Sequence, residues 1–190
     1  DVYFLNLPLY HVAALSLLMR AFLRGGSIAI NPKDESIITH LSVVPAMVNN
    51  ILEKKLYPNL KAMLLGGNVI KEDLANKIAA AGYPLYVTYG MTEMSSHIFV
   101  SRYKKEEGVC FSLPLLKRRV KQDADGVLLV KGCGKFISYS DSLESEWIHT
   151  KDVFKKENGK FYFIKRKDQM FISGGENIYP EEIKQALLTL

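Results

Sequence analysis

Short apolar segments alternate with helical ones along the first half of this 190-residue chain. Strands are predicted at residues 2–5, 27–30, 41–44, 60–65 and 83–88. Helices are predicted between them at residues 12–23, 45–55 and 71–81. This alternation favours an α/β fold in which a mainly parallel sheet is layered with helices on both faces.

The pattern changes after residue 99, where the predicted strands become shorter and are separated by turns. They are expected at residues 127–130, 136–139, 153–155 and 161–165. Asn158-Gly159, between the last two, is a strong hairpin signal. We therefore predict that residues 1–100 are part of a large N-terminal α/β domain and that residues 101–165 form a small antiparallel β subdomain. A charged break, a strand and a helix predict that residues 166–190 are a hinge and the truncated start of a small α+β domain.

Composition limits the class of protein. A hydrophobic share of 48% and a charged share of 24% are ordinary for a globular protein, and no apolar run reaches the ~20 residues that span a bilayer. The chain starts without a basic leader, a cleavage site or an initiator Met, so we expect it to begin inside a larger protein. Cys110 and Cys133 match no metal or redox spacing, and we expect reduced thiols in a cytoplasmic protein.

Part of the net charge of +5 comes from a basic run at residues 117–121. A nucleic-acid patch is one interpretation of this run, but no aromatic residue interleaves with its charges, which favours a solvated loop. The four histidines form no close-spaced pair of the kind that holds zinc. We therefore expect no nucleic-acid partner, no zinc site and no membrane span.

The predicted strand at 83–88 leads directly into Tyr-Gly-Met-Thr-Glu at residues 89–93. In open α/β sheets, ligands bind outside the carboxyl ends of the strands. Tyr89 offers an aromatic face for a base, and Gly90 lets a ligand approach the backbone closely. The Thr92 hydroxyl can bond a phosphate oxygen, and the Glu93 carboxylate can hold Mg²⁺. The alternative interpretation is a strand, a turn and a solvated glutamate.

Two other predicted strand ends are candidates for the same crevice. Gly66-Gly67 follows the fourth strand, and its backbone could lie against one face of a flat base while Tyr89 covers the other. Residues 7–11, which include His11, follow the first strand and could wall the crevice. A lone histidine after a strand is more often structural, so His11 alone decides little.

Asp152 lies between aromatic and apolar residues and therefore needs a partner. The partner could be a pair of sugar hydroxyls, as in nucleotide sites, or a salt bridge to Arg166. Arg166 could contact a ligand between domains or be a solvated linker charge. Gly174-Gly175 could be a tight turn or let a narrow group pass close to the backbone. The sequence has no Gly-x-x-x-x-Gly-Lys-Ser/Thr loop and no Gly-x-Ser-x-Gly elbow.

Taken together, these segments resemble the acyl-adenylate-forming superfamily of acyl-CoA synthetases, firefly luciferase and peptide synthetase adenylation domains. Over nearly the whole chain, six motifs follow the order of that family. They are Leu-Pro-Leu-Tyr-His at 7–11, Leu-Leu-Gly-Gly at 64–67, Tyr-Gly-Met-Thr-Glu at 89–93, Thr-Lys-Asp at 150–152, Arg-Lys-Asp-Gln at 166–169 and Ser-Gly-Gly-Glu-Asn-Ile-Tyr-Pro-Glu-Glu-Ile at 173–183. Their short spacing is most similar to o-succinylbenzoate–CoA ligases of menaquinone biosynthesis, and relatives of 4-coumarate–CoA ligase share much of it.

The resemblance implies which residues bind the cofactors. They would be Gly66, Gly67, Tyr89, Gly90, Asp152, Arg166, Gly174 and Gly175. Tyr89 would stack on the adenine of ATP, with Gly66 and Gly67 lining the same slot. Asp152 would bind the ribose hydroxyls, assisted by Arg166.

The resemblance also implies the catalytic residues. Thr92 would contact the α-phosphate, Glu93 would be the Mg²⁺ ligand, and His11 would line the acyl or CoA channel. Asp168 would be the hinge at which the small domain rotates between the two half-reactions. The glycines at 174–175 would lie beside the pantetheine tunnel of the co-substrate CoA.

The implied reaction activates a carboxylic acid with ATP and transfers the acyl group to CoA. Lys151 and Lys165 stand where the family has glycine, and Asn-Val-Ile at 68–70 stands where Ala-Pro-Leu is commoner. A nucleotide-binding module without ligase activity is therefore the alternative. The phosphate loop and the catalytic lysine of the family would lie outside this chain, so we expect the 190 residues alone to be inactive or nearly so.

Overall fold

The computed structural model describes residues 1–137, 145–167, 171–173 and 176–178, and single positions at 180, 183, 187 and 188. Its larger sheet has six strands in the order β2-β1-β3-β4-β5-β6. The strands are β1 (Val2–Phe4), β2 (Ser27–Ala29), β3 (His40–Val43), β4 (Ala62–Leu65), β5 (Leu85–Met91) and β6 (Ser96–Arg102). All pairs are parallel except β5 with β6, so the predicted α/β class with a mainly parallel sheet is confirmed.

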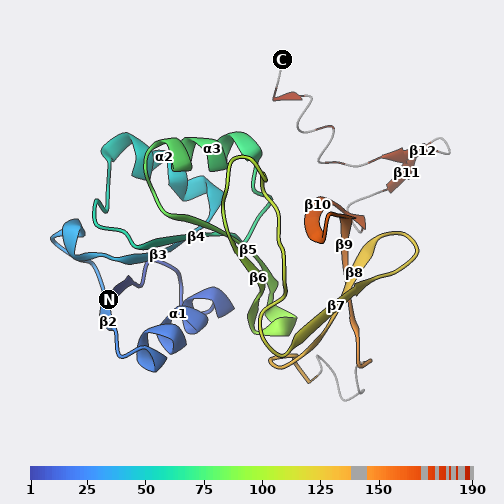
Figure 1. The fold of residues 1–190 in the computed structure, drawn as a ribbon, viewed down its shortest axis with the longest axis horizontal. Coiled ribbons are helices and arrows are strands. Elements are labelled where there is room, and N and C mark those ends of the chain that lie inside the picture. The colour runs from blue at the N-terminus through green and yellow to red at the C-terminus, as the bar shows by residue number, and fades with distance from the viewer. Residues whose placement is uncertain are drawn as a thin grey trace.

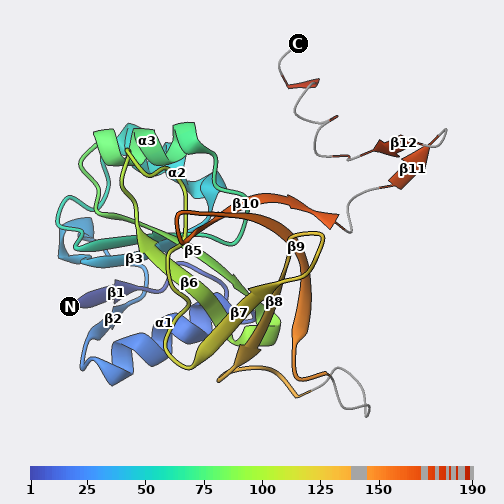
Figure 2. The ribbon, with the colours of Figure 1, turned by 45° about the vertical axis from the view of Figure 1, so that its right-hand side comes forward.

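Helices cover both faces of this sheet. They are α1 (Val12–Leu23), α2 (Pro45–Lys54) and α3 (Glu72–Ala80). Figure 1 shows α2 and α3 on one face and α1 on the other, and the turned view of Figure 2 agrees. Pro45 opens α2, as the sequence predicted, because proline at the first turn lacks only an N–H that would have no partner in the helix.

The segment after β5 contains a strand, β6, which the sequence analysis did not predict. β5 continues beyond its predicted end through Tyr89 to Met91, turns in the short 3₁₀ helix η2 (Thr92–Met94), and returns as β6. Ile98 and Phe99 at the centre of β6 are fully buried. The polar residues around them join the ladder through backbone groups, which pair whatever the side chain.

A second, antiparallel sheet follows, with strand order β10-β9-β8-β7. Its strands are β7 (Arg118–Gln122), β8 (Val127–Gly132), β9 (Ile148–Glu157) and β10 (Lys160–Arg166). The predicted hairpin is confirmed: β9 and β10 are joined at Asn158 and Gly159, whose φ angles are +49° and +76°. Two left-handed residues give a turn whose twist matches that of the flanking strands.

The basic run at 117–121 is mostly strand, so its interpretation as a solvated loop is wrong. Side chains of β7 alternate between half-buried (Arg118, Val120) and exposed (Arg119, Lys121). A strand in which every second residue faces water tolerates such charge, because only one face is buried. The strand predicted at 136–139 is absent at its first two positions, and the other two lie outside the described residues.

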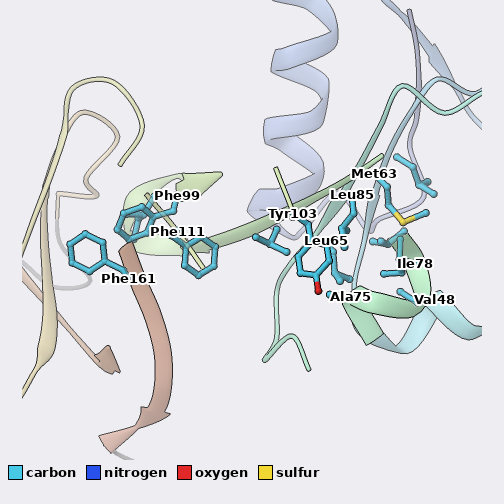
Figure 3. Close-up of a cluster of buried hydrophobic side chains, with 14 of the residues drawn as sticks. Val48, Met63, Leu65, Ala75, Ile78, Leu85, Phe99, Tyr103, Phe111 and Phe161 are labelled. Atoms are coloured by element: carbon cyan, nitrogen blue, oxygen red, sulfur yellow. The ribbon is translucent and has the colours of Figure 1, made fainter. Parts of the chain in front are cut away.

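Aromatic side chains join the two sheets. The ring of Phe99 in β6 lies 5.4 Å from Phe111 and 5.4 Å from Phe161 of β10. Phe111 and Phe161 also exchange two backbone hydrogen bonds, of 2.9 and 2.7 Å. Figure 3 shows these three rings at one end of the core and aliphatic side chains of α2, α3, β4 and β5 at the other. This contact brings β9 beside the end of β5, where Tyr89 lies 5.0 Å from Phe154.

Beyond β10 the structure describes a short antiparallel pair, β11 (Phe171–Ser173) and β12 (Glu176–Ile178). Asp168, Gly174 and Gly175 lie outside the described residues, as does most of the predicted helix at 180–190. The division of the chain after residues 100 and 165 stays a prediction. None of the helices described is long and apolar enough to cross a membrane.

Candidate functional site

The carboxyl ends of β4 and β5 lie side by side, because the two strands are hydrogen-bonded neighbours. Gly66 follows β4 and is buried against Thr88 of β5: a Cβ at Gly66 would lie 2.1 Å from Thr88 Oγ1. Thr88 Oγ1 also donates to the Leu65 carbonyl at 3.2 Å. Any larger side chain at Gly66 would therefore push the strand ends apart. Gly67 is exposed and has a φ of +77°, which favours glycine.

Tyr89 joins the end of β5 to the second sheet. Its half-buried ring touches Phe154 edge-on, and its hydroxyl donates a 2.7 Å hydrogen bond to Asp152 Oδ2. Burial, and then the neighbouring carboxylate of Asp152, raise the pKa of Tyr89 well above its ordinary value. The hydroxyl therefore stays protonated and remains a donor at neutral pH.

Asp152 is only 6% exposed and is held from several sides. Besides the hydrogen bond from Tyr89, Asp152 accepts one from Arg166 Nη1, which lies 3.2 Å from Oδ1. The backbone N–H of Asp152 donates to Thr150 Oγ1 at 3.1 Å, and that hydroxyl donates to the Leu128 carbonyl at 2.8 Å. The salt bridge to Arg166 that the sequence left open is thus present. It also orients the carboxylate.

Lys151, next to Asp152, has a φ of +64°. This left-handed conformation is one that glycine adopts freely and other residues adopt at a cost of about 1–2 kcal/mol. The backbone at Lys151 therefore has the conformation expected of the glycine that the resemblance implies at this position. The substitution has not removed Asp152 from its contacts with Tyr89 and Arg166.

Thr92 and Glu93 lie in η2, the tight turn between β5 and β6. Thr92 is exposed and Glu93 is half-buried. Two bonds fix this turn to the segment after β8: the Phe136 N–H donates to the Glu93 carbonyl at 2.8 Å, and Ser95 Oγ donates to the Gly134 carbonyl at 2.7 Å. The turn is therefore a rigid support for both side chains.

Gly90 is required by the strand pairing itself. A Cβ there would lie 2.0 Å from the carbonyl oxygen of Ser96 on β6, at the point where the β5–β6 register shifts. Only a glycine lets the chains approach this closely.

His11 is not brought to these residues by any contact of the described part of the chain. It is the exposed N-cap residue of α1, and its ring lies 4.5 Å from that of Tyr10. The remaining predicted residues, Asp168, Gly174 and Gly175, cannot be placed because they lie outside the described ranges.

Sequence reasoning missed a polar cluster beside this site. Arg20 of α1 contacts His97 of β6, with 2.9 Å between Nη1 and Nε2, and also donates to Ser16 Oγ at 3.1 Å and Ser42 Oγ at 3.3 Å. Ser16 and Arg20 interrupt the apolar run of the helix and are four residues apart, which places them on one helix face. Two polar residues on one face of an otherwise apolar helix indicate a polar partner for that face, and this signal is present in the sequence.

Glu93 is the carboxylate beside Thr92 that could hold a magnesium ion. Over residues 1–137, 145–167 and the other described positions, no three His, Cys, Asp or Glu side chains gather as metal ligands. Mg²⁺ commonly takes one or two carboxylates and completes its shell with phosphate oxygens and water. The single carboxylate of Glu93 next to the Thr92 hydroxyl therefore fits an ion that arrives with a nucleotide.

A hollow lies elsewhere, along the β7–β8 hairpin. It has a volume of about 630 Å³ and is lined by Lys117, Arg119, Lys131, Gly132, Cys133, Lys135 and Glu146. None of these residues takes part in the Tyr89–Asp152 contact.

A family model described as "AMP-binding enzyme" matches residues 1–139. The chain belongs to this family of AMP-binding enzymes. The resemblance predicted from the motifs is therefore confirmed at the level of the family.

Similar proteins of known name agree with the family. This chain is 32% identical, over its whole length, to a 2-succinylbenzoate–CoA ligase of Bacillus cereus, of which it covers 46%. Among solved structures, it matches O-succinylbenzoate coenzyme A synthetase (MenE) from Bacillus subtilis in complex with ATP and magnesium ion. The TM-score is 0.84 and the sequence identity is 28%, and the match covers 100% of this chain and 46% of that one. An E. coli MenE variant with bound OSB-AMS gives a TM-score of 0.85 at 28% identity, with 100% and 44% covered. The chain spans about half the length of the curated relatives it matches.

Proposed function

We propose that this chain is part of an acid–CoA ligase that activates a carboxylic acid with ATP and Mg²⁺ and transfers the acyl group to CoA. The proposed acid is 2-succinylbenzoate, which appears in the names of the relatives matched over the full chain. The observation that carries the proposal is the 2.7 Å contact of Tyr89 with the buried Asp152, beside Gly66, in a chain of the AMP-binding family. An aromatic face, a narrow glycine slot and an oriented carboxylate are what a nucleoside requires.

The nucleoside would bind at the end of β5. The face of Tyr89 would stack on adenine, and the backbone of Gly66 and Gly67 would lie against the base on the β4 side. Asp152 would accept hydrogen bonds from the ribose hydroxyls. Tyr89 and Arg166 hold its carboxylate from two directions, so the group is oriented before a nucleotide arrives.

The phosphates would lie over η2. The Thr92 hydroxyl would donate to the α-phosphate, and Glu93 would hold Mg²⁺. When bound, Mg²⁺ neutralises charge on the phosphate oxygens. Because Ser95 and Phe136 tie the turn down, Thr92 and Glu93 keep their spacing as that charge develops.

Two half-reactions follow from this arrangement. In the first, an oxygen of the acid attacks the α-phosphorus of ATP in line, and the bond to the bridging oxygen of the β-phosphate breaks, releasing pyrophosphate. The Thr92 donor offsets negative charge on the α-phosphate during this step. In the second, the CoA thiol loses its proton and attacks the acyl carbon, and AMP leaves with the electrons of the acyl–oxygen bond.

For the second half-reaction, we propose residue roles that rest on the family resemblance alone. His11 would line the acyl or CoA channel, Asp168 would be the hinge, and Gly174 and Gly175 would flank the pantetheine arm. We also propose a cytoplasmic location, which the free thiols of the described cysteines, Cys110 and Cys133, support.

The test is ATP–pyrophosphate exchange by the intact protein with a panel of carboxylic acids. We expect exchange that depends on Mg²⁺ and is fastest with 2-succinylbenzoate. Exchange with other acids alone would keep the ligase and reject the named acid. ATP binding without exchange for any acid would favour a non-catalytic nucleotide-binding module, the alternative that Lys151 and Lys165 suggest.

A further inference from the structure

The basic run at 117–121 has no role in the proposed nucleotide site, and the fold gathers it with other cations into one surface. Directly opposite residues of an antiparallel pair lie on the same face of a sheet. Arg119 of β7 is opposite Lys131 of β8, and both Arg119 and Lys121 are exposed. The other face of the hairpin carries Val130, which is fully buried. The outer face of the β7–β8 hairpin is therefore basic.

The hollow of about 630 Å³ along this hairpin collects the same charges. Four cationic side chains and one carboxylate line it: Lys117, Arg119, Lys131, Lys135 and Glu146. Lys131 Nζ lies 2.5 Å from Glu146 Oε1, and Glu146 is the one acid among the described residues that line the hollow. The acids at the tip of the hairpin, Asp123 and Asp125, each bond to another basic side chain. The hollow thus presents a net positive charge to solvent.

Exposed leucines on a fixed turn lead into this surface. They are Leu113, Leu115 and Leu116, which are 78%, 38% and 89% exposed. The Leu115 N–H donates to the Ile98 carbonyl of β6 at 2.9 Å, and the Lys117 carbonyl accepts from the Cys133 N–H at 3.0 Å. Single exposed leucines are ordinary, but three within four residues beside a cluster of cations indicate an interaction surface.

The surroundings of Trp147 distinguish between two kinds of polyanion. Lys121 Nζ lies 4.5 Å and Lys131 Nζ lies 4.7 Å from the centroid of its half-buried ring. The ring is therefore already engaged in cation–π contacts. Surfaces that hold single-stranded nucleic acid instead offer open aromatic faces on which bases stack. The exposed apolar groups here are leucines, which give no stacking platform but can enter the acyl boundary of a bilayer.

We propose that the outer face of the β7–β8 hairpin and the turn at residues 113–116 dock the protein on an anionic phospholipid bilayer. The cations at positions 117, 119, 121, 131 and 135 contact the phosphate headgroups, and the exposed leucines enter the boundary between headgroups and acyl chains. A few charges alone bind weakly and are screened by salt, so the apolar contribution is needed as well. This inference does not depend on the proposed ligase function, because none of these residues belongs to the nucleotide site.

The test is co-sedimentation of the intact protein with lipid vesicles. The probes are vesicles of phosphatidylcholine alone and vesicles of equal parts phosphatidylcholine and phosphatidylglycerol. In about 0.1 M salt, where the Debye length is about 10 Å, we expect binding to the anionic vesicles and little binding to the neutral ones. Binding to the anionic vesicles should weaken as the salt concentration is raised.

Two kinds of variant separate charge from apolar contact. Lys117→Gln and Arg119→Gln should each weaken the partition onto anionic vesicles about fivefold, because a cation near such a surface contributes about 1 kcal/mol. Leu116→Ser leaves the charge unchanged and should weaken the partition about tenfold by keeping one leucine out of the acyl boundary. All three residues are exposed, so the melting temperatures of the variants should equal that of the wild type.

Each kind of variant has a matched control elsewhere on the chain. Lys77→Gln removes the same charge from an exposed position on α3, which packs against the other sheet. Ile30→Ser removes an exposed apolar side chain next to β2. Both controls should bind anionic vesicles as the wild type does.

A wild type that binds neither kind of vesicle would overturn the docking surface, and so would a Lys77→Gln loss equal to that of Lys117→Gln. Losses in the charge variants without a loss in Leu116→Ser would show a surface that does not enter a bilayer, and would also reject it. Tighter binding to single-stranded DNA of mixed sequence than to anionic vesicles would assign the face to nucleic acid instead. Selective losses in both kinds of variant would support the surface, whether or not the protein catalyses ATP–pyrophosphate exchange.

Discussion

Replacing Tyr89 with phenylalanine separates the two roles of this residue. The change keeps the ring, which lies 5.0 Å from Phe154, and removes the hydroxyl that donates to Asp152 at 2.7 Å. If the ring binds the base and the hydroxyl orients the carboxylate, the variant should lose stability but keep most of its affinity for adenine.

The loss can be estimated from the surroundings of the bond. A hydrogen bond to a charged group contributes about 1.5–3 kcal/mol. Asp152 is 6% exposed, so water replaces the lost donor poorly, while Arg166 remains as a partner with a side chain that is 43% exposed. We therefore expect Tyr89→Phe to lower the free energy of unfolding by about 2 kcal/mol. For a unit of this size, each kcal/mol lowers the melting temperature by about 2–4 °C.

A double-mutant cycle with Asp152→Asn isolates the bond from other effects of each change. Urea unfolding of the four proteins should give a coupling free energy of about 1.5–3 kcal/mol between the two residues. The KM for ATP should rise much less for Tyr89→Phe than for Tyr89→Leu, which also removes the aromatic face. A coupling below about 0.5 kcal/mol, within the error of additivity, or equal KM values for the two Tyr89 variants, would refute this reasoning.

Glu93→Gln in the intact protein should slow ATP–pyrophosphate exchange at least about tenfold by weakening Mg²⁺ binding; unchanged exchange would remove Glu93 from the metal. The pKa of His97 is lowered from 6.5 to about 4, so below about pH 6.5 the unfolded state binds a proton that the folded state does not. Stability should therefore fall from about pH 6.5 to about pH 4, and His97→Gln should flatten that part of the profile in melting temperatures; parallel profiles would contradict this. Gly66→Ala should destabilise the protein by at least about 2 kcal/mol, because its Cβ would lie 2.1 Å from Thr88 Oγ1. Thr88→Ala should recover part of that loss in urea unfolding, and no recovery would count against the clash.

Several elements followed from residues that are adjacent in the sequence. The apolar run at 12–23 became α1 with the predicted bounds, and Pro45 opened α2 where a helix start was expected. Asn158 and Gly159 formed the predicted hairpin turn, since both adopt left-handed φ angles easily. In each case the preference is local, so a single sequence carries it.

Strands that depend on a distant partner were harder to recognise. The sequence of β6 shows no clear alternation, and β7 is mostly charged, yet both are ordered by pairing with β5 and β8. Their half-exposed residues made them resemble loops. Burial of the strand centre by another element, such as Phe99 against Phe111, decided the outcome.

The sequence by itself determined the α/β class and the family, because these depend on local pattern and on the order of motifs. Only the tertiary structure decided which side chains meet. Counting back from the Asn158-Gly159 turn would place Lys165 opposite Asp152, but a register shift between Phe163 and Lys165 brings Arg166 there instead. The contact between Arg20 and His97 joins residues 77 positions apart. Register and sheet order arise from packing over the whole chain, so neither pairing could be obtained from adjacent residues.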